Sequence, residues 1–226
     1  MPEVAMSPKA GAHGELCGLL AIRAAHEAKG EGEQRKTVLV PTSAHGTNPA
    51  TAALAGYSVQ EVAQTADGRV DIADLAAKLG PHIAAVMVTN PNTCGLFERE
   101  AREIARLTHE AGAYFYGDGA NFNAIVGRVR PGDLGVDAMH INLHKTFSTP
   151  HGGGGPGAGP VVLSAALAAH APAPWVVSGP DGLRLVEETV DEAAQGFSRM
   201  SAFHGQMGMF VRAYAYMVSH GADGLR

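Results

Sequence analysis

The 226-residue sequence predicts an α/β fold, a mostly parallel sheet flanked by helices. Short apolar runs alternate with longer segments whose apolar residues recur at helical spacing, which is the pattern of repeated βα units. A polar or glycine-containing loop follows each apolar run, as expected for parallel strands whose carboxyl ends lie next to a ligand site. With 46% hydrophobic and 17% charged residues, the chain is long enough to bury one substantial core.

The expected elements follow in chain order. Strands are predicted at 38–40, 83–88, 114–116, 139–142 and 160–163. Helices are predicted at 15–29, 72–79 and 98–110. Gly30 and Gly112 follow two of these helical segments, and glycine is the residue that most often ends a helix. No internal repeat or charged linker divides the chain, so we expect a single domain over 1–226.

Composition excludes several classes of function. The net charge of -5 comes from 17 basic and 22 acidic residues without a basic block, so nucleic acid is not an expected partner. The two cysteines, Cys17 and Cys94, lack CxxC spacing and predict neither a disulfide framework nor a thiolate metal site. No apolar run approaches the length of a membrane span, and the N-terminus lacks a secretory signal. A cytoplasmic protein with no membrane partner is expected.

Polar loops that follow the predicted strands contain the candidate functional residues. These loops lie at 41–46, 89–93, 117–121 and 143–146, and the segment 10–14 opens the first helix. Ligands of open α/β sheets bind just beyond the carboxyl ends of the strands. The loops are therefore expected to meet at one site.

Lys145 and Asp118 suggest a pyridoxal 5'-phosphate site. A Schiff-base lysine has to lie at a strand end so that its amine reaches a ligand above the sheet, and Lys145 follows the predicted strand 139–142. A carboxylate such as Asp118 is needed opposite it to keep the pyridinium nitrogen protonated. In the alternative interpretation, Lys145 is a surface lysine at a strand end and Asp118 caps the turn into Gly119.

Three further residues suit the phosphate and the ring. Gly11 and Ala12 lie at a glycine-rich helix start, where free backbone N–H groups and the helix dipole bind anions. His45 can stack on the face of the pyridine ring. An ordinary helix entry, and a histidine that caps the helix near Asn48, are the corresponding alternatives.

Asn90, Asn142 and His144 complete the candidates. Asn90 could donate a hydrogen bond to the phenolic oxygen of the ring, although Asn-Pro also starts turns with no ligand. Asn142 can reach the cofactor only if its strand ends or bends nearby. His144 could transfer protons or contact the cofactor. A metal site of His140, His144 and His151 is not favoured, because the segment lacks the acids and cysteines that complete such sites.

Longer motifs carry a resemblance to a known family. The runs SAHGTNPA at 43–50, DGANFNA at 118–124, NLHKTF at 142–147 and PHGGGGPG at 150–157 resemble the P-protein of the glycine cleavage system. The similarity is closest to the second subunit of the two-subunit bacterial form, and it covers nearly the whole chain.

This resemblance implies a fold-type I pyridoxal phosphate enzyme, a glycine dehydrogenase (aminomethyl-transferring). Such an oxidoreductase decarboxylates glycine, releases CO2 and transfers the aminomethyl group to the lipoyl group of H-protein, beside a companion P-protein subunit. By motif, Lys145 would be the Schiff-base lysine, Asp118 the partner of the pyridinium nitrogen and His45 the stacking residue. Gly11 and Ala12 match the phosphate-binding helix start.

The family also implies a longer chain. Its members extend past both ends of this sequence, so 1–226 is expected to be the cofactor-binding large domain without the small C-terminal domain, and the activity of this chain alone stays open. The glycine run 152–159 is expected to form a functional loop beside the transfer channel, or else a plain turn.

Other functions share part of this pattern. Another fold-type I enzyme, an aminotransferase or an amino-acid decarboxylase, would also use Lys145 and Asp118. A catalytically incompetent structural subunit or fragment would not bind the cofactor. A nucleotide-binding module at 152–159 is less favoured, because the run lacks the GK[ST] ending of a phosphate loop.

Overall fold

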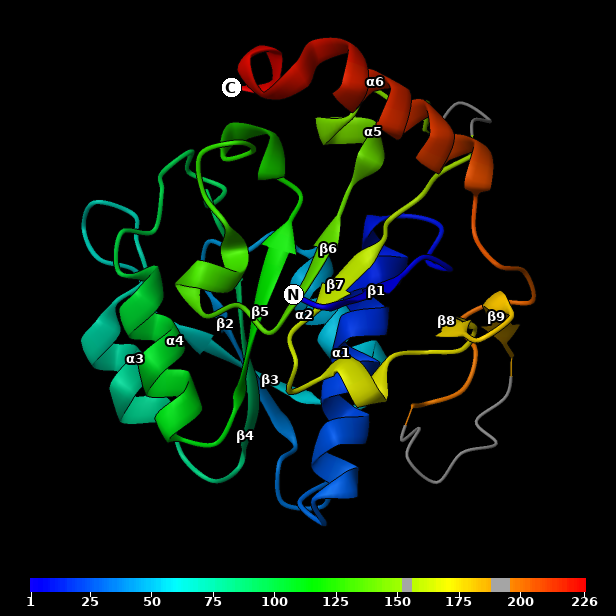
Figure 1. The fold of residues 1–226 in the computed structure, drawn as a ribbon. Helices are drawn as coiled ribbons and strands as arrows, with labels where there is room; N and C mark the ends of the chain where they lie inside the picture. The colour runs from blue at the N-terminus through cyan, green and yellow to red at the C-terminus, as the bar shows by residue number, and fades with distance from the viewer. Residues whose placement is uncertain (152–155, 188–195) are drawn as a thin grey trace.

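A seven-stranded sheet lies between layers of helices in a computed structural model that describes residues 1–151, 156–187 and 196–226 (Figure 1). The strand order is β1-β7-β6-β5-β4-β2-β3. Within this sheet β7 alone runs against its neighbours, because it pairs antiparallel with both β1 and β6 while the remaining pairs are parallel. The predicted α/β fold with a mostly parallel sheet is confirmed.

The elements alternate along the chain as βα units require. The strands of the sheet are β1 (Glu3–Ala5), β2 (Thr37–Pro41), β3 (Ser58–Val62), β4 (Ile83–Thr89), β5 (Tyr114–Gly119), β6 (Ala138–Ile141) and β7 (Val161–Leu163), and a hairpin is formed by β8 (Trp175–Gly179) and β9 (Gly182–Val186). The helices are α1 (Gly11–Ala28), α2 (Thr47–Leu54), α3 (Ile72–Lys78), α4 (Ala101–Glu110), α5 (Leu143–Thr146) and α6 (Met207–Leu225), with 3-10 turns at Phe122–Ala124, Pro131–Leu134 and Ala168–His170.

The five predicted strands occur as β2, β4, β5, β6 and β7, and the three predicted helices as α1, α3 and α4. Gly30 and Gly112 have positive φ angles just after α1 and α4, as predicted for helix stops. The expected ends of two strands were wrong. Asp118 lies inside β5 and not in a loop, because β5 continues through Gly119. Asn142 is not part of β6, which ends at Ile141, but precedes the first turn of α5.

Two apolar clusters cover the two faces of the sheet. Alternate residues of one strand point to opposite faces. Val38 and Val40 of β2 therefore join the cluster under α1 and α2, while Leu39 joins the cluster under α3 and α4. The layers hold the carboxyl ends of β4, β5 and β6 side by side.

Glycines let α1 approach the sheet closely. A Cβ at Gly14 would lie 2.7 Å from both His140 Cβ and the Gly159 carbonyl oxygen, and a Cβ at Gly18 would overlap the Tyr116 ring. Because these positions have no side chain, the N-terminal half of α1 lies directly against β6 and β5. This contact brings the first turn of α1 to the ends of the central strands.

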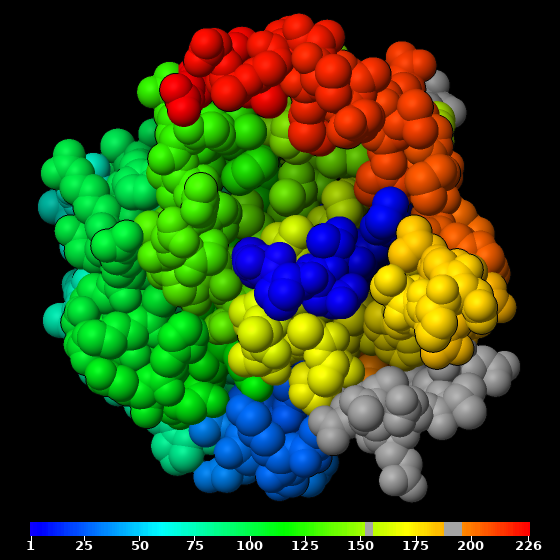
Figure 2. All heavy atoms as spheres, viewed as in Figure 1, coloured from blue at the N-terminus to red at the C-terminus, as the bar shows by residue number. Residues whose placement is uncertain are grey.

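The remaining elements surround that end of the sheet. Helix α6 lies over α5, and Met209 and Ala213 pack on Leu143 and Phe147 (Figure 1). The N-terminal strand β1 forms the edge of the sheet beside β7, and Figure 2 shows the N-terminal residues, in blue, at the surface. None of the described helices is long and apolar enough to cross a membrane.

Candidate active site

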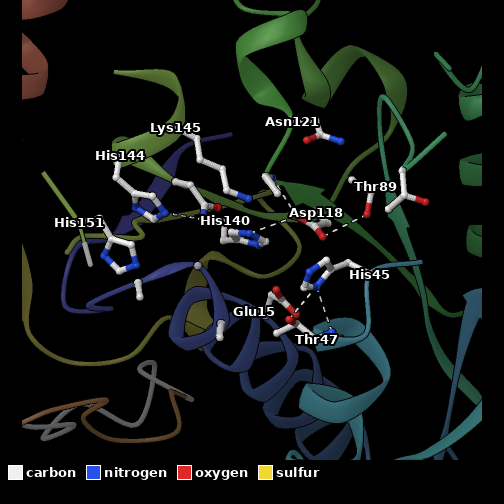
Figure 3. Close-up of a pocket in the computed structure, with 16 residues that line it drawn as sticks. Glu15, His45, Thr47, Thr89, Asp118, Asn121, His140, His144, Lys145 and His151 are labelled. Carbon is white, nitrogen blue, oxygen red and sulfur yellow. Dashed lines mark hydrogen bonds and ion pairs between the residues drawn. The ribbon is translucent and has the colours of Figure 1, made fainter. Parts of the chain in front are cut away.

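A pocket of about 310 Å³ lies where β4, β5 and β6 end and α1 begins (Figure 3). This volume is in the range of small-molecule sites. The predicted site residues that line it are Gly11, Ala12, His45, Asp118, Asn142, His144 and Lys145. Residues that line it without having been predicted are Ala10, Glu15, Thr47, Thr89, Thr93, Ala120, Asn121, His140 and His151.

Asp118 is a buried carboxylate with three hydrogen-bond donors. Its Oδ1 accepts a hydrogen bond from the Ala120 N–H at 2.8 Å, and His140 Nε2 lies 3.2 Å from the same oxygen. Its Oδ2 accepts from Asn48 Nδ2 at 3.0 Å and from Thr89 Oγ1 at 3.1 Å. The three donors hold the orientation of the carboxylate. Such a group can keep a protonated ring nitrogen beside it.

His140 orients Asp118 as a neutral imidazole. Its Nδ1 lies 2.7 Å from the Tyr116 hydroxyl, and both residues are fully buried. Burial lowers the pKa of His140 and raises the pKa of Tyr116 well above its usual value. The phenol therefore keeps its proton and donates it to Nδ1, so the ring proton of the neutral imidazole lies on Nε2, 3.2 Å from Asp118 Oδ1. Because His140 is neutral, this contact is not a pair of opposite charges.

Lys145 reaches the same pocket from α5. Among the described residues, no hydrogen bond or ion pair engages its amine, while its charge acts on both Glu15 and His140. Lys145 and Asp118 come from neighbouring elements and converge in Figure 3. An unpaired amine facing a fixed carboxylate is the arrangement that the sequence predicted.

His144 lies beside Lys145 and stacks on His151, with ring centroids 3.8 Å apart. Burial, followed by the neighbouring charges of His151 and Lys145, lowers the pKa of His144 to about 4. The Asn142 side-chain nitrogen lies 3.3 Å from His144 Nε2. His144 is therefore neutral at neutral pH and accepts a hydrogen bond from Asn142.

The first turn of α1 offers unpaired backbone donors. The cap residue Ala10 has no side-chain hydrogen bond, the first turn contains no acid, and the first N–H bonded back along the helix is that of Gly14, to Ala10 at 2.9 Å. The N–H groups of residues 11–13 thus have no intrahelical partner, and the helix dipole is positive there. This is a site for an anion such as a phosphate.

His45 lies on the opposite side of the pocket from Lys145 (Figure 3). Its Nδ1 contacts Thr47 twice, at 3.2 Å from the backbone nitrogen and 2.8 Å from Oγ1. Thr47 therefore sets the plane of the imidazole. Stacking of His45 on a ring stays a prediction.

Asn90 is the predicted residue that the structure does not bring into the pocket. Its Oδ1 accepts a hydrogen bond from the Glu98 backbone nitrogen at 3.0 Å, and it lines a neighbouring small cavity under Asp118. Its Nδ2, the donor that the predicted contact with a ring oxygen needs, has no hydrogen-bond partner among the described residues, so that contact stays a prediction. Of the glycine run, residues 152–155 lie outside the described residues.

Sequence reasoning missed Glu15, Asn48, Thr89 and His140 as site residues. Glu15 had a recognisable signal, because it lies one helical turn after Gly11 and hence on the same side of α1. Thr89 belonged to a loop singled out for function. Asn48 is completely buried, and nothing in its local pattern pointed to a contact with Asp118, 70 residues later.

Comparisons with known proteins show the family to which the chain belongs. Residues 18–198 match the aminotransferase class-V family. The chain is 79% identical over its whole length to probable glycine dehydrogenase (decarboxylating) subunit 2 of Caulobacter vibrioides, of which it covers 43%. It is 53% identical to the protein of the same description from Thermus thermophilus, again over its whole length and over 47% of that relative. The chain therefore spans about half the length of the curated relatives it matches.

Solved structures share the fold. A crystal structure of glycine decarboxylase (P-protein) of the glycine cleavage system, in inhibitor-bound form, matches with a TM-score of 0.74 and 24% identity, over 97% of this chain and 49% of that one. A sphingosine-1-phosphate lyase of Burkholderia pseudomallei matches with a TM-score of 0.67 and 16% identity, over 98% of this chain and 48% of that one.

Proposed function

Because the chain belongs to the aminotransferase class-V family, we propose that it is the pyridoxal phosphate-binding large domain of a glycine decarboxylase. Enzymes of this family and the glycine decarboxylases depend on pyridoxal phosphate. The observation that carries the proposal is the pocket in which the Lys145 amine, which has no partner among the described residues, meets the Asp118 carboxylate and the first-turn N–H groups of α1.

The residues present fit the cofactor. The N–H groups of residues 11–13 would bind the phosphate, Asp118 the ring nitrogen and Lys145 the aldehyde carbon covalently. His45 would cover one face of the ring. When bound, the cofactor supplies an electron sink for the bond that breaks at the substrate α-carbon. Nothing in the pocket has to move away for these roles, because no side chain pairs with Lys145 among the described residues.

The protein's own groups control protons around the ring. Asp118, fixed by three donors, would hold the proton on the ring nitrogen and so keep the ring able to accept electrons. A pKa of about 4 makes His144 a weak base at neutral pH, so we assign it to contact with the cofactor and the orientation of Asn142 in preference to proton transfer.

The proposed substrate is glycine, which would lose its carboxylate as CO2. The remaining aminomethyl group would pass to the lipoyl disulfide of H-protein, which is reduced as it accepts the group. The names of the relatives, "decarboxylating" and "subunit 2", support glycine decarboxylation and a companion subunit. We also propose a cytoplasmic location, since an exposed thiol such as Cys94 suits a reducing compartment.

Release of labelled CO2 from carboxyl-labelled glycine tests this function, in the full-length protein assembled with its companion subunit and lipoylated H-protein. We expect Asp118→Ala to retain glycine binding and to lower CO2 release roughly a hundredfold, about 3 kcal/mol of barrier. Asp133→Ala, at a surface 3-10 turn outside the pocket, is the control and should leave the rate unchanged. Equal rates in Asp118→Ala and wild type would show that the assignment is wrong, whereas a transamination product in place of CO2 would identify an aminotransferase.

A further inference from the structure

Glu15 is a second buried carboxyl group in the pocket, and it has no role in the function proposed above. It lies in the first turns of α1, is 4% exposed and lines the pocket beside Asp118. One ligand atom each of Glu15, Asp118 and His140 lie within 4.8 Å of one another. Two acids this close inside a protein need a structural reason, because burying a second carboxyl group is costly.

Asn48 of α2 joins the two acids. Its Nδ2 donates one hydrogen bond to Glu15 Oε2 at 3.1 Å and another to Asp118 Oδ2 at 3.0 Å. Both protons of the amide are therefore used, and the side chain is completely buried. With Glu15 as its second acceptor, the amide is held so that it points at Asp118. Without Glu15, one N–H of Asn48 would have no partner in the interior.

The two acids differ in the number of their donors. Asp118 accepts three hydrogen bonds and has His140 Nε2 beside its Oδ1, whereas Glu15 accepts hydrogen bonds from Asn48 and from the Thr51 hydroxyl. Burial, and next the charge of Asp118, raise the pKa of Glu15 to about 7. Glu15 is thus a carboxyl group that holds its proton up to about neutral pH.

A metal ion explains this cluster less well. Asp118 already accepts one hydrogen bond at Oδ1 and two at Oδ2, and His140 uses Nδ1 for Tyr116 while its Nε2 carries the ring proton. Few lone pairs are left to coordinate a cation. The residues around Asp118 are therefore better explained as groups that hold its carboxylate in position.

We propose that Glu15 is a positioning residue, which acts through the Asn48 amide to hold the Asp118 carboxylate against the ring nitrogen of pyridoxal phosphate. This inference rests on the proposed function, because it assumes that the cofactor binds at Lys145. Glu15 itself would touch neither the substrate nor the reacting atoms.

Two substitutions separate a hydrogen-bond role from a charge role. Glu15→Gln keeps the reach and an oxygen acceptor for Asn48 but removes the ionisable group. Glu15→Asp keeps the ionisable group but is one methylene shorter, so it withdraws the acceptor from Asn48. Glu98 offers the matched control, because it is a buried glutamate that accepts a hydrogen bond from Asn92 Nδ2 at 2.7 Å without any link to Asp118. Glu98→Asp should therefore leave the affinity for the cofactor and the absorbance of the bound cofactor unchanged.

Two readouts on the full-length protein report the state of the cofactor without turnover. One is the dissociation constant of pyridoxal phosphate, and the other is the pH midpoint at which the visible absorbance of bound cofactor changes. The groups that surround Asp118 and can influence this midpoint are Glu15 of α1, Asn48 of α2, Thr89 of β4, Tyr116 of β5, His140 of β6 and Lys145 of α5. Of these residues, the variants replace Glu15 alone.

The expected result is that Glu15→Asp weakens cofactor binding roughly tenfold and lowers the absorbance midpoint by about one pH unit, since one charge-assisted hydrogen bond is misaligned. Glu15→Gln should stay within about threefold of wild type. The inference is overturned if Glu15→Asp matches wild type in both readouts, or if Glu15→Gln is impaired and Glu15→Asp is not. A purely structural role predicts lower melting temperatures with both readouts unchanged, which also overturns it. Failure of wild type to bind the cofactor would instead refute the proposed function, and the inference with it.

Discussion

Replacing Glu15 by Gln should remove a pH dependence from the stability of the cofactor-free protein. The pKa of Glu15 is raised from 4.5 to about 7 in the folded state, chiefly by burial. Between these values the folded protein binds more protons than the unfolded chain, so the free energy of unfolding falls as the pH rises. A shift of roughly 2.5 units at 1.36 kcal/mol each corresponds to about 3 kcal/mol lost between pH 4.5 and 7. Glu15→Gln has no proton to lose and escapes this decrease.

Urea unfolding at several pH values, followed by circular dichroism, measures the effect as the midpoint concentration in wild type and variant. The advantage of Glu15→Gln over wild type should grow with pH up to about 7 and then level off. Glu33→Gln is the control, because the Glu33 side chain is 97% exposed and pays no burial cost. If the wild-type and Glu15→Gln curves stay parallel over this range, the buried neutral carboxyl is not present in the folded protein.

Three further changes test other contacts. Tyr116→Phe removes the donor to His140 Nδ1 and should lower the free energy of unfolding by about 1–3 kcal/mol in urea titrations; no loss would mean that the hydroxyl does not fix the imidazole. Gly14→Ala places a Cβ 2.7 Å from His140 Cβ and should cost about 1–3 kcal/mol by thermal denaturation, while Gly208→Ala, with open space around it, should cost nothing. Asp118→Ala should lower CO2 release from glycine roughly a hundredfold, as set out above.

The interior of the fold could be predicted from the sequence, but its edges could not. The central strands are mostly apolar, as buried parallel strands are, and β4 is buried along its whole length. Strand β3 was missed because most of its residues are exposed or half-buried, so Ser58, Gln60 and Glu61 give no apolar pattern. Strand β1 has only three residues. Such edge strands form because a neighbouring strand offers backbone hydrogen bonds. The pattern of apolar residues along the sequence does not show this pairing.

The site was predictable where a residue type and a strand end coincided. Lys145 and Asp118 were found in this way, and the structure brings them into one pocket. Asn48 and His140 were missed because their roles depend on contacts with residues far along the chain. Asn90 was included because it follows a strand; its Oδ1 is engaged by the loop that it starts, while its Nδ2 has no hydrogen-bond partner among the described residues, so its role stays a prediction.

The central claim is that Lys145 holds pyridoxal phosphate. Borohydride reduction of the cofactor-loaded protein, followed by peptide mass spectrometry, tests it most directly, because reduction makes the bond between lysine and cofactor permanent. We predict a pyridoxyl phosphate group on the peptide that contains Lys145, and its absence from Lys145→Ala. The same group on another lysine, or on none in folded wild-type protein, would contradict the account.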